Sequence, residues 1–139
     1  MIITNYTRQL LATLILSLFC LVSFSQSNET VIEIRSYNLK PGTRADFNKL
    51  FEEKALPLLK KWNITVVAYG ASSHDENSYF LARAFKDLDD RQKKEDAFYG
   101  SQDWETGPSK DILALINSYT TVVVPRDLFN EKSKTVKNP

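Results

Sequence analysis

The sequence contains little of the chemistry that small enzymes and metal proteins commonly use. Its 139 residues include one cysteine, Cys20, and one histidine, His74. Cys20 lies in an apolar N-terminal run, so a chain cleaved behind that run has no thiol. Such a chain has no disulfide framework, no thiolate nucleophile and no thiolate metal site. The remaining chain of about 115 residues is long enough to be held together by an apolar core alone.

An excess of charge of one sign is also absent. The chain has 18 Lys and Arg residues against 17 Asp and Glu residues. The N-terminal leader contains one basic residue, Arg8, and no acidic residue, so cleavage leaves 17 charges of each sign. Nucleic-acid binding needs a basic surface field. We therefore expect no nucleic-acid partner.

The single histidine is not accompanied by a ligand or catalytic set. His74 precedes Asp75 and Glu76, which leaves metal binding or acid–base chemistry as an alternative. It lies in a polar turn cluster, however, and no second histidine completes a metal site. The sequence also has no glycine-rich phosphate loop and no G-x-S-x-G motif. We predict a solvated turn residue, no metal and no cofactor.

The longest apolar run, residues 10–24, is short for a membrane span and follows a leader with one positive charge. It ends in Ser-Phe-Ser before Gln26, which is typical of an export signal. We predict a signal peptide over residues 1–25, cleaved after Ser25, and an exported protein, periplasmic or secreted, that leaves the membrane after cleavage. An uncleaved membrane anchor is the alternative. A lipoprotein modified at Cys20 ranks third, because the bulky Phe19 precedes it.

The stretch after the leader alternates with period two, as a strand with two different faces does. One side carries Ile32 and Ile34. The other side carries a carboxylate, a guanidinium and a phenol: Glu33, Arg35 and Tyr37. We expect the two isoleucines to seat the first helix, which leaves the polar side bare.

That helix is predicted over residues 44–62, where the apolar period lengthens. Thr43 and Asp46 have the spacing of a capping box. Pro57 should kink or restart the helix, because it lacks an N–H. Asn63 is a left-handed stop signal.

The remaining elements complete the order β-α-β-β-α-β. They are strand 64–71, strand 79–85, helix 88–99 capped by Asp87 and ended by Gly100, a helical piece capped by Ser109, and strand 119–124. With right-handed crossovers this order gives an α+β, ferredoxin-like fold with strands ordered 4-1-3-2 and helices on one face. Residues 26–125 form the domain, and residues 126–139 form a polar tail or an arm over a partner.

Four runs in this order resemble NIPSNAP domains: I-E-I-R-S-Y-N-L-K-P-G-T-R-A-D-F, A-R-A-F-K-D-L-D-D-R-Q, A-F-Y-G-S-Q-D-W and the closing valine strand. The resemblance covers Val31 to Val124. It implies a dimeric α/β barrel, in which two sheets face each other across a homodimer, and it implies no agreed activity. The leader is secretory in type, so nothing mitochondrial is carried over from eukaryotic members.

The polar residues of the first and third strands are the candidates for a site. Arg83 alternates with two alanines and should face Arg35 and Glu33 on the bare side of the sheet. The ligand-pocket candidates are Glu33, Arg35, Tyr37, Tyr69, Arg83 and Trp104. Buried arginines suit a carboxylate or another planar oxyanion. The alternatives are a structural ion pair at the dimer seam and, for Trp104, a plug of the barrel end. The mixed-sign run Arg91–Asp96 is predicted to be a solvated helix face.

These candidates favour a homodimeric protein that binds a small acidic or aromatic ligand. One alternative is a cofactor-independent oxygenase or isomerase, in which tyrosines or Glu33 would act as the base. Another is a protein-interaction module that pairs through its sheet face.

Overall fold

The structure is a computed structural model that describes residues 29–129. The strand β1 (Val31–Leu39) lies in the middle of the sheet and pairs with one strand on each side. The other strands are β2 (Thr65–Ala71), β3 (Ser78–Phe85) and β4 (Ile116–Pro125). All pairs are antiparallel and the order is β2-β3-β1-β4, so the predicted α+β, ferredoxin-like sheet is confirmed. The predicted signal peptide and most of the predicted tail lie outside the described residues.

The first crossover is one helical segment in three parts: α2 (Arg44–Leu50), a π-helical turn η2 (Phe51–Ala55) and α3 (Leu56–Lys61). Pro57 lies in the first turn of α3, where its missing N–H is tolerated. The predicted restart at Pro57 is therefore confirmed. Asn63 has φ 54°, which confirms the left-handed stop.

The second crossover is α4 (Leu88–Tyr99), α5 (Gln102–Glu105) and α6 (Ser109–Ala114). Asp87 caps α4 by accepting from the Asp90 amide at 2.8 Å, and Gly100 is its C-cap, as predicted. The short α5 was not predicted.

Two predicted caps are wrong. The Thr43 hydroxyl donates to the Lys40 carbonyl at 2.8 Å and accepts from no helix amide, so no capping box forms. Ser109 is the first residue of α6, and Pro108 stands at the N-cap. A side chain that could cap a helix can bind a neighbouring carbonyl instead, as Thr43 does, and a proline can occupy the N-cap position, as Pro108 does.

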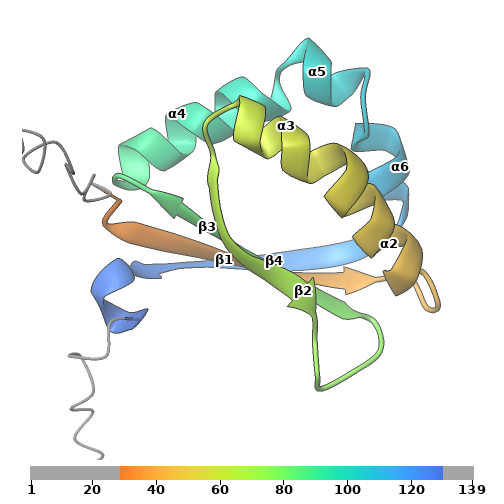
Figure 1. The fold of residues 1–139 in the computed structure, drawn as a ribbon. Helices are drawn as coiled ribbons and strands as arrows, with labels where there is room; N and C mark the ends of the chain where they lie inside the picture. Colours follow the sequence, from red (N-terminus) through yellow and green to blue (C-terminus); the bar gives the residue numbers. More distant parts are fainter. Residues whose placement is uncertain (1–28, 130–139) are drawn as a thin grey trace, which may run out of the picture.

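Helices α2 to α6 cover one face of the sheet, while a short 3-10 helix, η3 (Arg126–Phe129), follows β4 on the other side (Figure 1). Arg126 holds η3 to the start of β1, because its amide donates to the Thr30 carbonyl at 2.9 Å and its guanidinium pairs with Glu29 at 2.5 Å. Among residues 29–129, no helix has the length and apolar character needed to cross a membrane.

The prediction of which sheet face is covered is wrong. The main core contains sheet residues from the polar side of β1 and its partners, packed with the helices; its buried members include Tyr37, Leu39, Phe47, Phe51, Leu59, Leu81, Phe85 and Phe98. Ile32, Ala82 and Ala84 form a separate small cluster with Ile34 and Val124. Side chains alternate along a strand, so Glu33, Arg35 and Arg83 lie under the helices. Period two shows that two faces differ but not which one is covered.

The assignment of faces predicts the effect of a core truncation. Leu81→Ala should lower the free energy of unfolding by about 2–5 kcal/mol, because Leu81 is buried in the main core. The matched Leu88→Ala change, at a residue that is 60% exposed, should cost less than about 1 kcal/mol. Urea unfolding measures both values, and equal losses would contradict the assignment.

Candidate functional site

A buried ion pair joins the two central strands. The β1–β3 register places Glu33 opposite Arg83, and both residues are fully buried. The Arg83 Nε donates to Glu33 Oε1 at 3.2 Å, and Arg83 Nη2 donates to the same oxygen. This pair fixes two charges in the sheet face beneath α4.

Helix α4 supplies the partners of the charged sheet side chains from one face, since residues 91, 95 and 99 are spaced four apart. Arg35 Nη2 donates to Glu95 Oε1 at 2.8 Å, and Arg35 Nη1 donates to the Tyr99 hydroxyl at 2.9 Å. Arg83 also donates to Glu95 and, at 3.2 Å, to the Tyr99 hydroxyl. The predicted solvated face is therefore wrong at Arg91 and Glu95.

Arg91 closes the network from the helix. Its Nε donates to Glu33 Oε2 at 2.5 Å, and its Nη2 pairs with Glu95 Oε2 at 2.8 Å. We call Glu33, Arg35, Arg83, Arg91 and Glu95 the arginine–glutamate cluster. Every carboxylate oxygen of this cluster has an arginine partner.

The two carboxylates of the cluster have pKa values shifted in opposite directions. Burial raises the pKa of Glu33, but the charge and hydrogen bonds of Arg83 and the charge of Arg35 lower it by more. Burial and the charge of Glu33 raise the pKa of Glu95 by more than the arginines lower it. Glu33 is therefore the more acidic carboxylate of the cluster, and Glu95 is the more easily protonated one.

A pocket of about 380 Å³ lies beside the cluster, between β1, β4 and the second group of helices. Its wall includes two arginines, a glutamate and four aromatic side chains: Arg35, Arg91, Glu95, Tyr37, Tyr99, Trp104 and Tyr119. Burial raises the pKa of Tyr37 above its ordinary value, so this phenol stays neutral. The wall can bind a small anion with a planar, apolar body.

The structure brings together some of the predicted site residues and separates others. Arg35, Tyr37 and Trp104 line the pocket. Glu33 and Arg83 lie in the cluster and do not line it. Tyr69 is elsewhere, with its ring 5.0 Å from the Phe51 ring in the core.

The location of the pocket also differs from the prediction. It lies between the sheet and the helices of one chain, and not between two sheets, because the polar side of β1 faces α4. Sequence reasoning missed Arg91, Glu95, Tyr99 and Tyr119. The spacing of four residues from 91 to 99 was the available signal for three of them.

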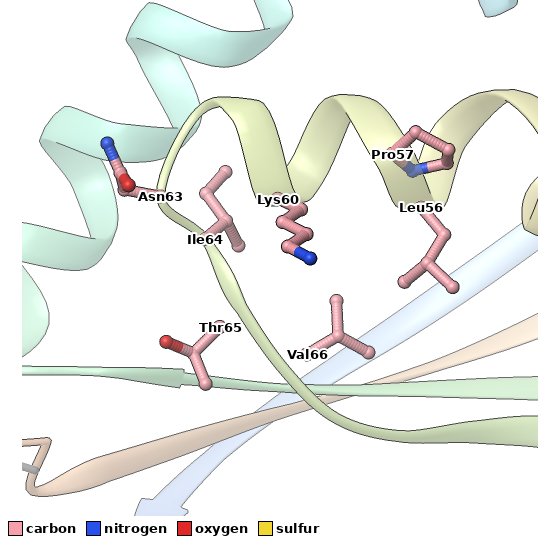
Figure 2. Close-up of a pocket in the computed structure, with 7 residues that line it drawn as sticks. All are labelled: Leu56, Pro57, Lys60, Asn63, Ile64, Thr65 and Val66. Atoms are coloured by element: carbon pink, nitrogen blue, oxygen red, sulfur yellow. The ribbon is translucent and has the colours of Figure 1, made fainter.

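A larger groove of about 710 Å³ lies between α3 and the edge strand β2. Figure 2 shows Leu56 and Lys60 pointing from α3 toward Val66 of β2. Lys60 is the single charged residue of its wall. Binding sites combine an apolar wall with several convergent polar groups, so the smaller pocket is the better candidate.

His74 does not contribute to either pocket. It is exposed in the β2–β3 turn, where its amide donates to Ser72 Oγ at 3.0 Å. Within residues 29–129, no group of three or more His, Cys, Asp or Glu side chains is arranged to hold a metal ion.

The fold and the pocket define a ferredoxin-like α+β protein with a polar cavity beneath its helices. The NIPSNAP family model matches residues 32–125, so the chain belongs to the NIPSNAP family. No curated protein matches the chain.

Solved structures share this fold. A NIPSNAP family protein of unknown function from Agrobacterium tumefaciens has a TM-score of 0.64 at 24% identity, over 72% of this chain and 90% of that one. A second NIPSNAP family protein from Agrobacterium tumefaciens has a TM-score of 0.64 at 18% identity, over 68% and 90%. A protein from Nitrosomonas europaea with a provisional assignment as an antibiotic biosynthesis monooxygenase has a TM-score of 0.51 at 14% identity, over 68% and 95%.

The buried cluster predicts a pH-dependent loss of stability in Glu33→Gln. At neutral pH the variant should lose about 3–5 kcal/mol of unfolding free energy, because Arg35, Arg83 and Arg91 then share Glu95 as the one remaining carboxylate of the cluster. The folded pKa of Glu33 lies below its ordinary 4.5, so its stabilisation is complete above that pH. It is lost as the pH falls through the folded pKa, so the difference between wild type and variant should shrink.

Urea unfolding at neutral and acid pH measures this difference. Glu105→Gln, at an exposed residue, is the matched control and should leave the unfolding free energy within about 0.5 kcal/mol of the wild type. A Glu33→Gln variant as stable as the control would show that the cluster is not buried as described.

Proposed function

We propose that this NIPSNAP protein binds a small acidic or aromatic ligand in the pocket between β1, β4 and α4. The observation that carries the proposal is Arg35, a cation that lines the pocket with aromatic side chains around it. Its guanidinium carbon lies 5.0 Å from the Tyr119 ring and 5.6 Å from the Tyr99 ring. Guanidinium groups recognise carboxylates, and aromatic walls favour flat ligands.

We propose that two copies of the protein form a homodimer, which buries the face of the sheet opposite the helices. Part of that face is apolar: Ile34 and Val124 lie beside the small cluster, and Val122, opposite Ile34, is 52% exposed. The helix η3 follows β4 on the same side of the sheet (Figure 1), and its Leu128 and Phe129 are 59% and 60% exposed. An exposed apolar surface of this kind is typical of an interface. The sequence predicts a polar face of the sheet at the dimer interface, whereas the interface proposed here uses the opposite face.

The proposal includes export of the chain, which rests on the apolar leader with its small residues before Gln26. N-terminal sequencing of the exported protein should begin at Gln26. Retention of residues 1–25 in the membrane fraction would instead support the anchor.

The alternative function is a cofactor-independent oxygenase or isomerase. The raised pKa of Glu95, which lines the pocket, favours a proton-transfer role. Against it, both Glu95 oxygens already accept from arginines. Oxygen uptake with phenolic substrates would support the enzyme, and its absence would leave the binding function. A pure interaction module would need the apolar face but not the pocket.

Ligand binding is tested with the two tryptophans as reporters. In an NMR titration with small aromatic acids, the indole N–H signal of Trp104 should shift, because Trp104 lines the pocket. The chemical shift of the Trp62 signal should not change, since its Nε1 donates to Asp103 Oδ2 at 3.0 Å outside the pocket. Equal shifts of both signals would indicate nonspecific binding and contradict the proposed site.

The dimer is tested with Val122→Asp. A carboxylate buried on the apolar face of each copy should raise the dimer dissociation constant by roughly a hundredfold or more. Leu88→Asp, at a residue 60% exposed in the helix layer, is the control and should dimerise like the wild type. Analytical ultracentrifugation measures both, and a monomeric wild type at micromolar concentration would refute the dimer.

A further inference from the structure

The charges of the arginine–glutamate cluster do not balance. Three guanidinium groups face two carboxylates, so the cluster carries one formal positive charge when both carboxylates are ionised. The other acidic residue of the pocket wall, Asp96, is exposed at the rim and accepts from Gln92 Nε2 at 2.8 Å. The inner wall therefore keeps an unneutralised positive charge.

One donor of the cluster also lacks an acceptor. The Nε of Arg35 is buried and has no hydrogen-bond partner among the described residues, while its Nη1 and Nη2 donate to Tyr99 and Glu95. Arg35 is 8% exposed and lines the pocket. A buried donor without a partner destabilises the folded protein, and an incoming acceptor removes that cost.

The three arginines therefore have different roles. Arg83 is fully buried and donates to Glu33, Glu95 and Tyr99, so it is structural. Arg91 uses its Nε and Nη2 on the two carboxylates. Arg35 lines the pocket and is the member whose unpaired donor, Nε, is buried.

The aromatic side chains restrict the shape of the ligand. The Arg35 guanidinium lies near the Tyr99 ring and, at 5.0 Å, the Tyr119 ring, which is 54% exposed. Because the Nε is buried, an acceptor reaches it after a neighbouring side chain moves, and the exposed Tyr119 ring near the guanidinium is free to do so. A flat ligand can then contact the rings of Tyr119 and Trp104, which both line the pocket.

We propose that the pocket selects planar aromatic acids with a single negative charge, and that Arg35 binds their carboxylate through its free Nε–H. This inference rests on the proposed ligand pocket. A monocarboxylate makes the cluster and ligand neutral together. A neutral ligand leaves one positive charge, and a dianion leaves one negative charge, and each costs more in a buried site than in water.

Four probes that vary one property at a time test the inference by NMR titration of the full chain at neutral pH. Benzoate is the planar monoanion, benzamide its neutral counterpart, phthalate the dianion and cyclohexanecarboxylate the non-planar monoanion. Benzoate should bind at least about tenfold more tightly than each of the others and shift the Trp104 indole signal. Arg35→Lys, which keeps the charge but removes the guanidinium and with it the Nε–H, should weaken benzoate binding by about tenfold. Arg126→Lys, remote in η3, is the matched control and should bind benzoate like the wild type.

The outcomes separate the inference from the function on which it rests. Benzamide or phthalate binding as tightly as benzoate would overturn the charge selection and leave the pocket as a ligand site. Equal binding of cyclohexanecarboxylate would overturn the planar class, and an unaffected Arg35→Lys variant would overturn the role of Arg35. If no probe shifts the Trp104 signal at millimolar concentration while the protein stays folded, both the inference and the ligand pocket are wrong.

Discussion

The structure depends on the pairing of buried charges between the sheet and α4. Glu33, Arg35 and Arg83 stand on the sheet face that the helices cover, where isolated charges would be costly. Arg91, Glu95 and Tyr99 project from one side of α4 and satisfy them. An apolar helix could not cover this face, so the cluster specifies which helix packs there and in which register. Buried ion pairs contribute more clearly to such specificity than to net stability.

The same cluster gives the molecule two different surfaces. Its charges are paired on the side of α4, where the sheet and helices enclose a pocket with an arginine and aromatic wall. The opposite side of the sheet keeps the small apolar residues, Ile32, Ala82 and Ala84, that need no polar partner. The proposed ligand binding and the proposed self-association therefore use opposite faces of the sheet, whereas a single cavity between two sheets would have combined them.

Local patterns in the sequence predicted the helices and strands, but they did not predict contacts between residues far apart in the chain. The strand order, the Asp87 cap and the left-handed Asn63 follow from short patterns, and the structure confirms them. Short patterns did not predict which face of the sheet is covered, because that depends on distant residues: Glu33 and Glu95, 62 positions apart, both accept from Arg83. A mixed-charge helix such as α4 resembles a solvated surface until its partners on the sheet are known. Arg35 and Tyr37 were found because they lie on the polar side of a strand that alternates with period two, and Trp104 was found because it precedes a Gly-Pro break.

The central claim is that the charged side of the sheet is buried beneath α4. The most direct measurement is a search for nuclear Overhauser contacts between the Arg83 side chain and the Tyr99 ring in the full chain. The account predicts these contacts, because the Arg83 guanidinium carbon lies 5.9 Å from the centre of that ring and its Nη1 donates to the hydroxyl. Contacts from Arg83 to a second copy of the chain, with none to Tyr99, would contradict it.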